Sequence, residues 1–212
     1  MEKIKRVLFI SVFINIVLLA HTGKKIYSRL SSVETNRPSH YAMRIDYFKS
    51  LPNPKNKIVM VGDSLIERGY WNELVDNSKV INRGISGITI RGLLKSRLVE
   101  SLDQSNEIIL LIGINDIWQN RDELDIQTDL KTLFTLLNKK NFKKVSIIGL
   151  LPAFDKELAE RDLMRKRVNK LIGQSRFHYI DLEETLNHSK FFMDGVHLNG
   201  HGYKTLVSKV FK

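Results

Sequence analysis

A serine, an aspartate and a histidine stand at positions where they could form the triad of a hydrolase. Ser64 follows the apolar run 58–62 and Asp63, and Asp194 precedes His197 by three residues near the end of the chain. A serine hydroxyl becomes a nucleophile when a base takes its proton, and a carboxylate can orient that base. The order Ser, Asp, His is one of several in which such triads occur. We therefore predict a serine hydrolase, with Ser64 as the nucleophile, His197 as the base and Asp194 as its partner.

Two further segments could stabilise the oxyanion of a tetrahedral intermediate. Gly84 ends the segment Asn82-Arg83-Gly84, and Asn115 follows the apolar run 108–112 by three residues. The backbone of a glycine can approach a substrate closely, and a side-chain amide is a common oxyanion donor. We expect the backbone N–H groups of Ser64 and Gly84 and the amide of Asn115 to be the donors. Gly84 and Asn115 could instead be turn residues.

Together these segments resemble the four sequence blocks of the GDSL, or SGNH, hydrolase superfamily. Ser64, Gly84, Asn115 and His197 match the residues of that name, with Asp194 completing the triad, and the match spans 58–203. The residues 149–152, 167–171 and 202–203 are most similar to the catalytic subunits of platelet-activating-factor acetylhydrolase and their bacterial relatives. The resemblance implies a serine esterase that works through an acyl-enzyme. Its expected substrate is a short-chain ester, above all an acetyl ester, of a carbohydrate or a lipid.

Other functions are compatible with the same residues. An O-acyltransferase would pass the acyl group to a sugar instead of water, and a lysophospholipase or a thioesterase would prefer long chains. A non-catalytic anchored binding module is the remote alternative, because a complete triad is present. Trp118 and Phe154 lie near the ends of the blocks and could line the acyl pocket, whereas Trp71 is expected in the core.

No metal or other cofactor is expected. The chain has no cysteine, which excludes disulfides and thiolate ligands. His201 follows His197 by four residues, but a second histidine alone is weak support for a metal site, and a surface position is favoured for it. Asp63 and Asp116 are expected to hold their loops in place and have no assigned catalytic role.

The elements that must position these residues alternate between strands and helices. Apolar, β-branched runs at 57–61, 79–81, 108–112, 145–150 and 178–180 predict five strands, and segments with helical spacing follow at 93–102, 124–138, 157–172 and 206–211. Strands without polar alternation are typical of a parallel sheet that is covered on both faces. We predict a doubly wound, flavodoxin-like α/β/α sandwich. Ser64, Gly84 and Asn115 would lie beyond the carboxyl ends of its strands, where such sheets bind ligands.

The N-terminal part carries a different signal. Residues 7–20 are apolar except for Ser11 and Asn15, and three basic residues precede them. This N-terminal hydrophobic helix could be an uncleaved membrane anchor, a cleaved signal peptide or a buried helix. The anchor is favoured because residues 18–23 form a poor cleavage site. We expect an anchor or signal over 1–23, a polar basic tether over 24–54 with a short helix near 41–49, and the hydrolase domain over 55–212.

The charge distribution agrees with a membrane partner. The chain has 34 Lys and Arg against 23 Asp and Glu, a net charge of +11, and residues 1–54 hold nine basic and three acidic side chains. Because much of the excess flanks the apolar segment, it indicates an anionic membrane surface sooner than nucleic acid. The expected location is therefore a membrane-anchored, extracytoplasmic catalytic domain, with secretion after signal cleavage as the alternative.

Overall fold

The computed structural model describes Thr22, residues 39–75 and residues 79–211. The predicted anchor or signal over 1–23 lies outside these residues except for Thr22, and so does the predicted tether before residue 39. Within the described part of the chain, no helix combines the length and the apolar character that crossing a membrane requires.

The five predicted strands form one parallel sheet in the order β2-β1-β3-β4-β5. Their bounds are β1 (Ile58–Gly62), β2 (Val80–Gly84), β3 (Glu107–Leu111), β4 (Lys144–Ile148) and β5 (His178–Ile180). Gly62 is in register with Gly84 on one side and with Leu111 on the other, so the carboxyl ends of β2, β1 and β3 lie level. This edge of the sheet is where the predicted site residues follow their strands.

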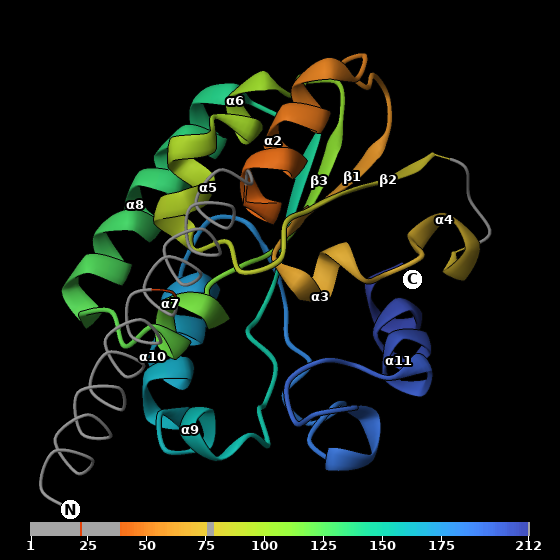
Figure 1. The fold of residues 1–212 in the computed structure, drawn as a ribbon. Coiled ribbons are helices and arrows are strands. Elements are labelled where there is room, and N and C mark those ends of the chain that lie inside the picture. Colours follow the sequence, from red (N-terminus) through yellow and green to blue (C-terminus); the bar gives the residue numbers. More distant parts are fainter. Residues whose placement is uncertain (1–21, 23–38, 76–78, 212) are drawn as a thin grey trace, which may run out of the picture. The chain divides into compact units, whose positions relative to one another are not determined.

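Two layers of helices cover the sheet, which confirms the doubly wound α/β/α prediction. Figure 1 shows α5, α6, α8 and α10 on one side of the sheet and α4 and α11 on the other. These helices are α4 (Trp71–Leu74), α5 (Ile90–Ser96), α6 (Leu98–Ser101), α8 (Glu123–Lys140), α10 (Asp162–Gly173) and α11 (Gly200–Val210). Further elements of this part are α3 (Ser64–Glu67), α7 (Ile114–Trp118), α9 (Lys156–Ala159) and a 3₁₀ turn, Ser189–Phe191.

The burial pattern explains why the strands lack polar alternation. In β1, Val59, Met60 and Val61 are all fully buried, so both faces of this central strand are covered. On α8 the buried side chains recur every three to four residues, which gives one apolar face; they are Ile126, Leu130, Leu133 and Leu137. The Asp122 side chain caps the start of this helix by accepting the backbone N–H of Leu124.

The short helix that we predicted near 41–49 is α2 (His40–Ser50), and it packs on the hydrolase domain as expected. The Tyr41 hydroxyl donates to the carbonyl of Gly92 at 3.0 Å, and Arg44 Nη2 donates to the carbonyl of Gly84 at 2.9 Å. Phe48 contributes its ring to the core. The compact unit accordingly runs from His40 to Lys212.

Candidate active site

Ser64 is the first residue of α3, directly beyond the carboxyl end of β1. The turn between the two elements needs a glycine at Gly62, because a Cβ there would lie 2.0 Å from the carbonyl oxygen of Leu111. Asp63 caps α3 by accepting the backbone N–H of Leu65 at 2.9 Å. The strand and the cap therefore hold Ser64 at the edge of the sheet.

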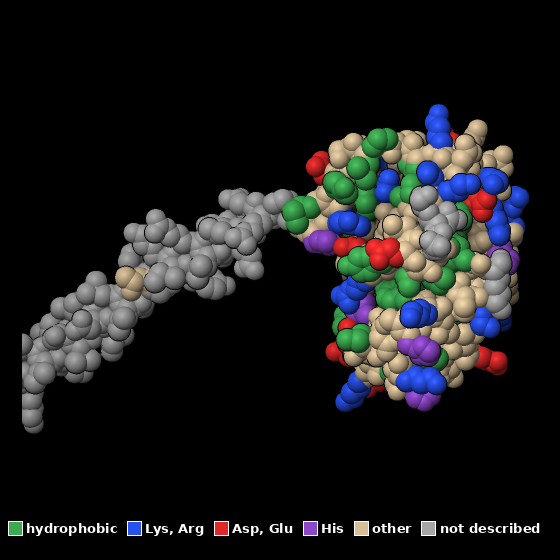
Figure 2. Space-filling model, turned by 90° about the vertical axis from the view of Figure 1, so that its right-hand side faces the viewer, with side chains coloured by type: hydrophobic (Ala, Val, Ile, Leu, Met, Phe, Trp, Pro, Cys, Tyr) green, Lys and Arg blue, Asp and Glu red, His purple; other side chains and the backbone are tan. Residues whose placement is uncertain are grey.

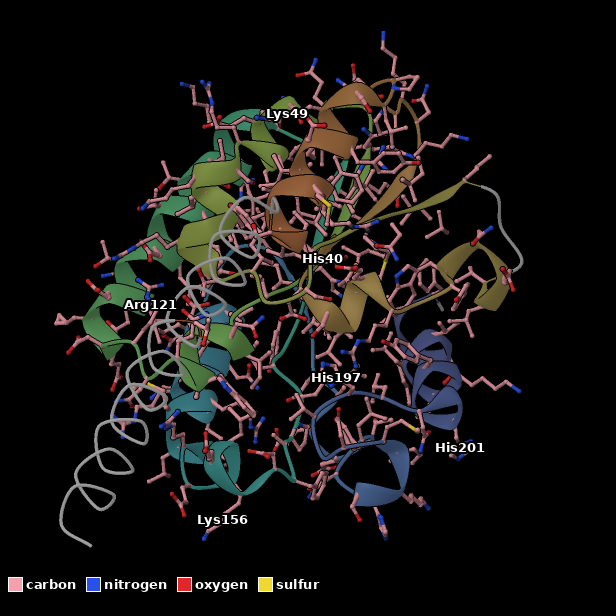
Figure 3. The ribbon with its side chains drawn as sticks, viewed as in Figure 1. His40, Lys49, Arg121, Lys156, His197 and His201 are labelled. Carbon is pink, nitrogen blue, oxygen red and sulfur yellow. The ribbon has the colours of Figure 1, made fainter. Side chains whose placement is uncertain are left out.

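The structure brings the three predicted triad residues together in one row. Ser64 Oγ lies 2.9 Å from His197 Nε2, and His197 Nδ1 lies 2.7 Å from Asp194 Oδ2. The other carboxylate oxygen of Asp194 accepts the backbone N–H groups of His197 at 2.8 Å and Val196 at 3.1 Å. His197 lies on the loop before α11 and points toward the start of α3 (Figure 3).

The protonation of this row follows from the surroundings of Asp194. Burial alone would raise its pKa, but the hydrogen bonds from the backbone and the ring of His197 and from the backbone of Val196 lower the pKa of Asp194 to about 2. An ionised carboxylate can only accept, so the proton of His197 lies on Nδ1. His197 Nε2 is then free to accept the proton of the Ser64 hydroxyl.

Two aromatic residues outside the predicted site tie the histidine loop to the serine helix. The Tyr203 hydroxyl, on α11, donates to the carbonyl of Leu65 at 2.9 Å. Trp71 is buried as expected, donates its indole N–H to the carbonyl of Ile66 at 2.8 Å and packs edge-on against Tyr203. The distance between Ser64 and His197 is therefore supported by contacts between α3, α4 and α11.

A cavity of about 340 Å³ opens beside the triad. Its lining combines the triad with apolar side chains and one further carboxylate: Ser64, Ile114, Asn115, Trp118, Asp155, Leu158, Asp194, Val196 and His197. Trp118 thus lines the cavity, as the sequence analysis expected. Asp155 and Leu158 were missed by the sequence analysis.

The prediction for Phe154 is corrected by the structure. Phe154 is not among the lining residues of the cavity, and its ring packs against that of Phe192 with centroids 5.3 Å apart. Its backbone N–H donates to the carbonyl of Gly195 at 2.7 Å. Phe154 therefore supports the loop that carries Asp194, and the neighbouring Asp155 faces the cavity in its place.

Asn115 lies in the first turn of α7, on the cavity wall. Its amide donates one hydrogen to the carbonyl of Ile88 at 3.0 Å, which leaves the second hydrogen for a ligand. Asp116 accepts the backbone N–H of Ile90 at 2.9 Å and forms an ion pair with Arg121. Asp116 therefore holds α7 against the loop before α5, the role that the sequence indicated.

The prediction for Gly84 as an oxyanion donor is also corrected. Its N–H donates to the side-chain oxygen of Asn82 at 2.8 Å, and a Cβ at this position would lie 2.2 Å from the backbone nitrogen of Glu67. Gly84 is therefore needed for close packing against α3, and its N–H is already used.

Gly87, three residues later, has the properties that were expected of Gly84. It adopts φ of +77° with open space around its Cα, and its N–H makes no hydrogen bond within the described residues. Hydrogen bonds to two other segments hold the turn 85–88, which carries Gly87. Glu67 accepts the N–H of Ser86, and Asn115 donates to the carbonyl of Ile88. The signal in the sequence was the second glycine of Gly84-Ile85-Ser86-Gly87.

The two other polar residues that the sequence analysis weighed near the triad are Asp63 and His201, and neither was assigned a catalytic role. Burial raises the pKa of Asp63 to about 7, against the hydrogen bond from Leu65, and one of its carboxylate oxygens has no hydrogen-bond partner among the described residues. Its place in the cap of α3 agrees with a loop-holding role. His201 is exposed, as favoured, and stacks on the ring of Phe191 with centroids 5.2 Å apart.

Comparison with known proteins places this geometry in a family. The model of the GDSL-like lipase/acylhydrolase family matches residues 60–205. A search of the curated proteins found no match.

Several solved structures share the fold. A protein of Streptococcus pneumonia described as a candidate platelet activating factor is 18% identical, with a TM-score of 0.72 over 87% of this chain and 97% of its own. A GDSL-like lipase of Bacteroides thetaiotaomicron VPI-5482 is 19% identical, with a TM-score of 0.64 over 81% and 95%. Axe2, an acetylxylan esterase of Geobacillus stearothermophilus, is 20% identical, with a TM-score of 0.59 over 74% and 93%.

At these identities the solved structures support the fold, and the family match carries the assignment. The matched residues 60–205 make up well over half of the 212-residue chain and contain the serine, the aspartate and the histidine of the row described above. The chain therefore belongs to the GDSL-like lipase/acylhydrolase family and is an ester hydrolase, as the resemblance of its sequence blocks implied.

Proposed function

We propose that this hydrolase releases short acyl groups, above all acetyl, from esters of a carbohydrate through an acyl-enzyme. The observation that carries the proposal is the row from Ser64 Oγ through His197 to Asp194 beside a cavity of about 340 Å³. Ser64 attacks the ester carbonyl while its proton passes to His197 Nε2. His197 then gives this proton to the departing alcohol, and water, activated by the same nitrogen, releases the acid and restores Ser64.

The negative charge that develops on the carbonyl oxygen needs donors that are already in place. We assign this role to the N–H groups of Ser64 and Gly87 and to the second amide hydrogen of Asn115. Neither N–H makes a hydrogen bond within the part of the chain that the structure describes. Because Asn115 is bonded to the turn that carries Gly87, the two donors are held relative to each other before substrate binds.

Replacing Asn115 by alanine is expected to reduce turnover by about 10²–10³-fold, because one oxyanion donor is lost. The melting temperature should fall only slightly, since a single hydrogen bond to Ile88 is removed. Turnover of a soluble acetate ester and thermal denaturation are measured on the same preparation. Asn138→Ala, at an exposed position on α8, is the matched control and should retain full turnover. A destabilised Asn115→Ala enzyme with normal turnover would show that Asn115 is only a turn residue.

The lining of the cavity supports a short acyl group on a polar carrier. A volume of about 340 Å³ is near the lower end for ligand pockets, which span roughly 300–1,000 Å³. Its apolar wall is formed by Ile114, Trp118, Leu158 and Val196. The carboxylate of Asp155 caps α9 through one oxygen, so its other oxygen can accept a hydroxyl of the carrier. The fold that the chain shares with an acetylxylan esterase supports the same substrate class.

A series of p-nitrophenyl esters, from acetate to palmitate, together with a sugar acetate, tests this function. We expect kcat/KM to fall by at least about tenfold from acetate to octanoate. The small cavity does not hold the longer acyl chain, so each added methylene must extend out of it or push its wall residues apart. The sugar acetate should yield free acetate. A preference for octanoate or palmitate would favour a lysophospholipase or a thioesterase instead. Transfer of acetyl to an added sugar without release of acetate would favour an acyltransferase.

A further inference from the structure

A second cavity, of about 510 Å³, lies between α2, α3, α4 and β2. It shares no lining residue with the cavity beside the triad. Three arginines line it, Arg44, Arg68 and Arg83, against a single carboxylate, Glu67. Figure 2 faces this side of the molecule, where Lys and Arg side chains lie among hydrophobic ones. We call this space the arginine cavity.

Arg83 is the unusual residue of the arginine cavity, because it is buried and the described residues give it no counter-ion. Only 7% of its surface is exposed, and its guanidinium lies over the ring of Phe48, 5.0 Å from the centroid. Its hydrogen bond within the described residues runs from Nη1 to the carbonyl of the adjacent Asn82, at 3.3 Å. No carboxylate of the described residues forms an ion pair with it.

The second arginine increases the imbalance of charge. Arg44 lies over the same ring, 4.5 Å from its centroid, and its buried Nε donates no hydrogen bond to any of the described residues. The nearest carboxylate oxygen, on Glu67, is 3.9 Å from that nitrogen. Glu67 already accepts hydrogen bonds from His40 and from the backbone of Ser86. Burial and the positive charge of Arg44 both lower the pKa of Arg83.

A buried charge is costly unless it is paired, and a guanidinium fork matches the oxygen atoms of a carboxylate or a phosphate. We propose that the arginine cavity binds an oxyanionic group, a phosphate or a carboxylate, that pairs with Arg83 and Arg44. The ligand brings negative charge to a cavity in which the described lining residues supply three arginines and a single carboxylate, Glu67. This site is separate from ester hydrolysis and goes beyond the proposed function.

The rest of the lining indicates what carries the anionic group. Tyr70 is 71% exposed and Tyr47 is 54% exposed, and both belong to the lining of the arginine cavity. Their rings offer flat, amphipathic surfaces with a hydroxyl at one end, beside the side-chain amide of Asn72. An acidic or phosphorylated sugar fits this combination, because its ring has an apolar face and its hydroxyls need polar partners.

Calorimetric titration of the full-length chain in detergent solution tests the proposal at constant ionic strength. The probes are inorganic phosphate, glucose 6-phosphate and glucuronate. We expect saturable binding, with at least one of the two sugar anions binding more tightly than inorganic phosphate. Arg83→Gln should weaken binding by about ten- to a hundredfold, because a charge-assisted pair is lost. The matched control Arg97→Gln removes the same charge from a side chain that is 80% exposed and does not line the cavity, and it should bind normally.

Thermal denaturation separates the loss of a binding group from a loss of folding. At ten times its dissociation constant, a ligand should raise the melting temperature of the wild type and of Arg97→Gln by about 3–6 °C, and that of Arg83→Gln by much less. Arg83→Lys keeps the charge without the fork and should bind with intermediate affinity. No saturable binding to the wild type, or equal binding to Arg83→Gln, would overturn the site. Equal affinity for all three probes would overturn its preference for sugars. None of these measurements depends on esterase activity.

Discussion

Replacing Ser64 by alanine is expected to lower the hydrolysis of an acetate ester by on the order of 10⁶-fold. The hydroxyl is the atom that would form the acyl-enzyme, and no other serine of the described residues lines the cavity beside His197. The remaining activity would come from binding and from the oxyanion donors alone. Turnover of p-nitrophenyl acetate and covalent labelling by a fluorophosphonate probe both measure the change.

The folded state should tolerate this substitution. The Ser64 hydroxyl has one partner within the described residues, His197, and the cap of α3 is provided by Asp63. We therefore expect a melting temperature close to that of the wild type. Ser101→Ala is the matched control, because its hydroxyl donates to the carbonyl of Leu98, remote from the cavity, and both readouts should stay normal. If Ser64→Ala is still labelled by the probe, the nucleophile is another residue.

The fold and the triad could be predicted from the sequence because their signals are local and repeated. Each strand is a short apolar run that ends at a polar or glycine segment, and a parallel sheet brings those ends to one edge. Ser64 follows directly after such a run, and Asp194 and His197 are only three residues apart. Their meeting requires a single long-range contact, between the end of β1 and the loop before α11.

The oxyanion donor was misplaced because two glycines of one segment look alike in the sequence. Gly84 and Gly87 differ only in backbone conformation and in what surrounds each Cα. Residue 84 must be a glycine because a Cβ there would collide with the backbone of Glu67. Residue 87 is a glycine because its φ is positive. Neither reason can be read from residue types, since the first depends on how closely α3 approaches the end of β2 and the second on the backbone conformation of the turn 85–88.

Part of the pocket wall, Asp155 and Leu158, and the arginine cavity were missed for a similar reason. In the loop before α9, a shift of one residue decides whether Phe154 or Asp155 faces the cavity, and loops have no periodicity that fixes this choice. The basic residues near α2 indicated a solvated tether, yet Arg44 and Arg83 meet at the ring of Phe48. Only the packing of α2 on β2 shows that Arg83 is buried and Arg44 half-buried.

Asp194→Asn is expected to reduce kcat by about 10⁴-fold while KM changes little. The asparagine oxygen can still accept the backbone N–H groups of Val196 and His197, so the loop should keep its shape. Its NH₂ group would face His197 Nδ1, which must then accept. The ring proton would move to Nε2, where it faces the Ser64 hydroxyl, and His197 could no longer act as a base.

The pH dependence of the wild type gives an independent test of the same carboxylate. The pKa of Asp194 is lowered to about 2, below its usual 3.8, so the ionised form is the one that the folded protein stabilises. This stabilisation is present above about pH 4 and is lost as the pH falls through 2. Asp194 should therefore remain ionised at pH 5, so a loss of activity between pH 7 and pH 5 should not come from protonation of this carboxylate.

Asp181→Asn is the matched control for Asp194→Asn. It removes a carboxylate that accepts a backbone N–H two residues ahead, as Asp194 does, but that carboxylate bonds to no histidine of the described residues. Kinetic measurements across pH 5–9 should show a large, nearly uniform loss of kcat for Asp194→Asn and normal values for Asp181→Asn. Near-normal turnover by a folded Asp194→Asn enzyme would mean that another group orients His197, because in that case the tautomer of the ring would not depend on this carboxylate.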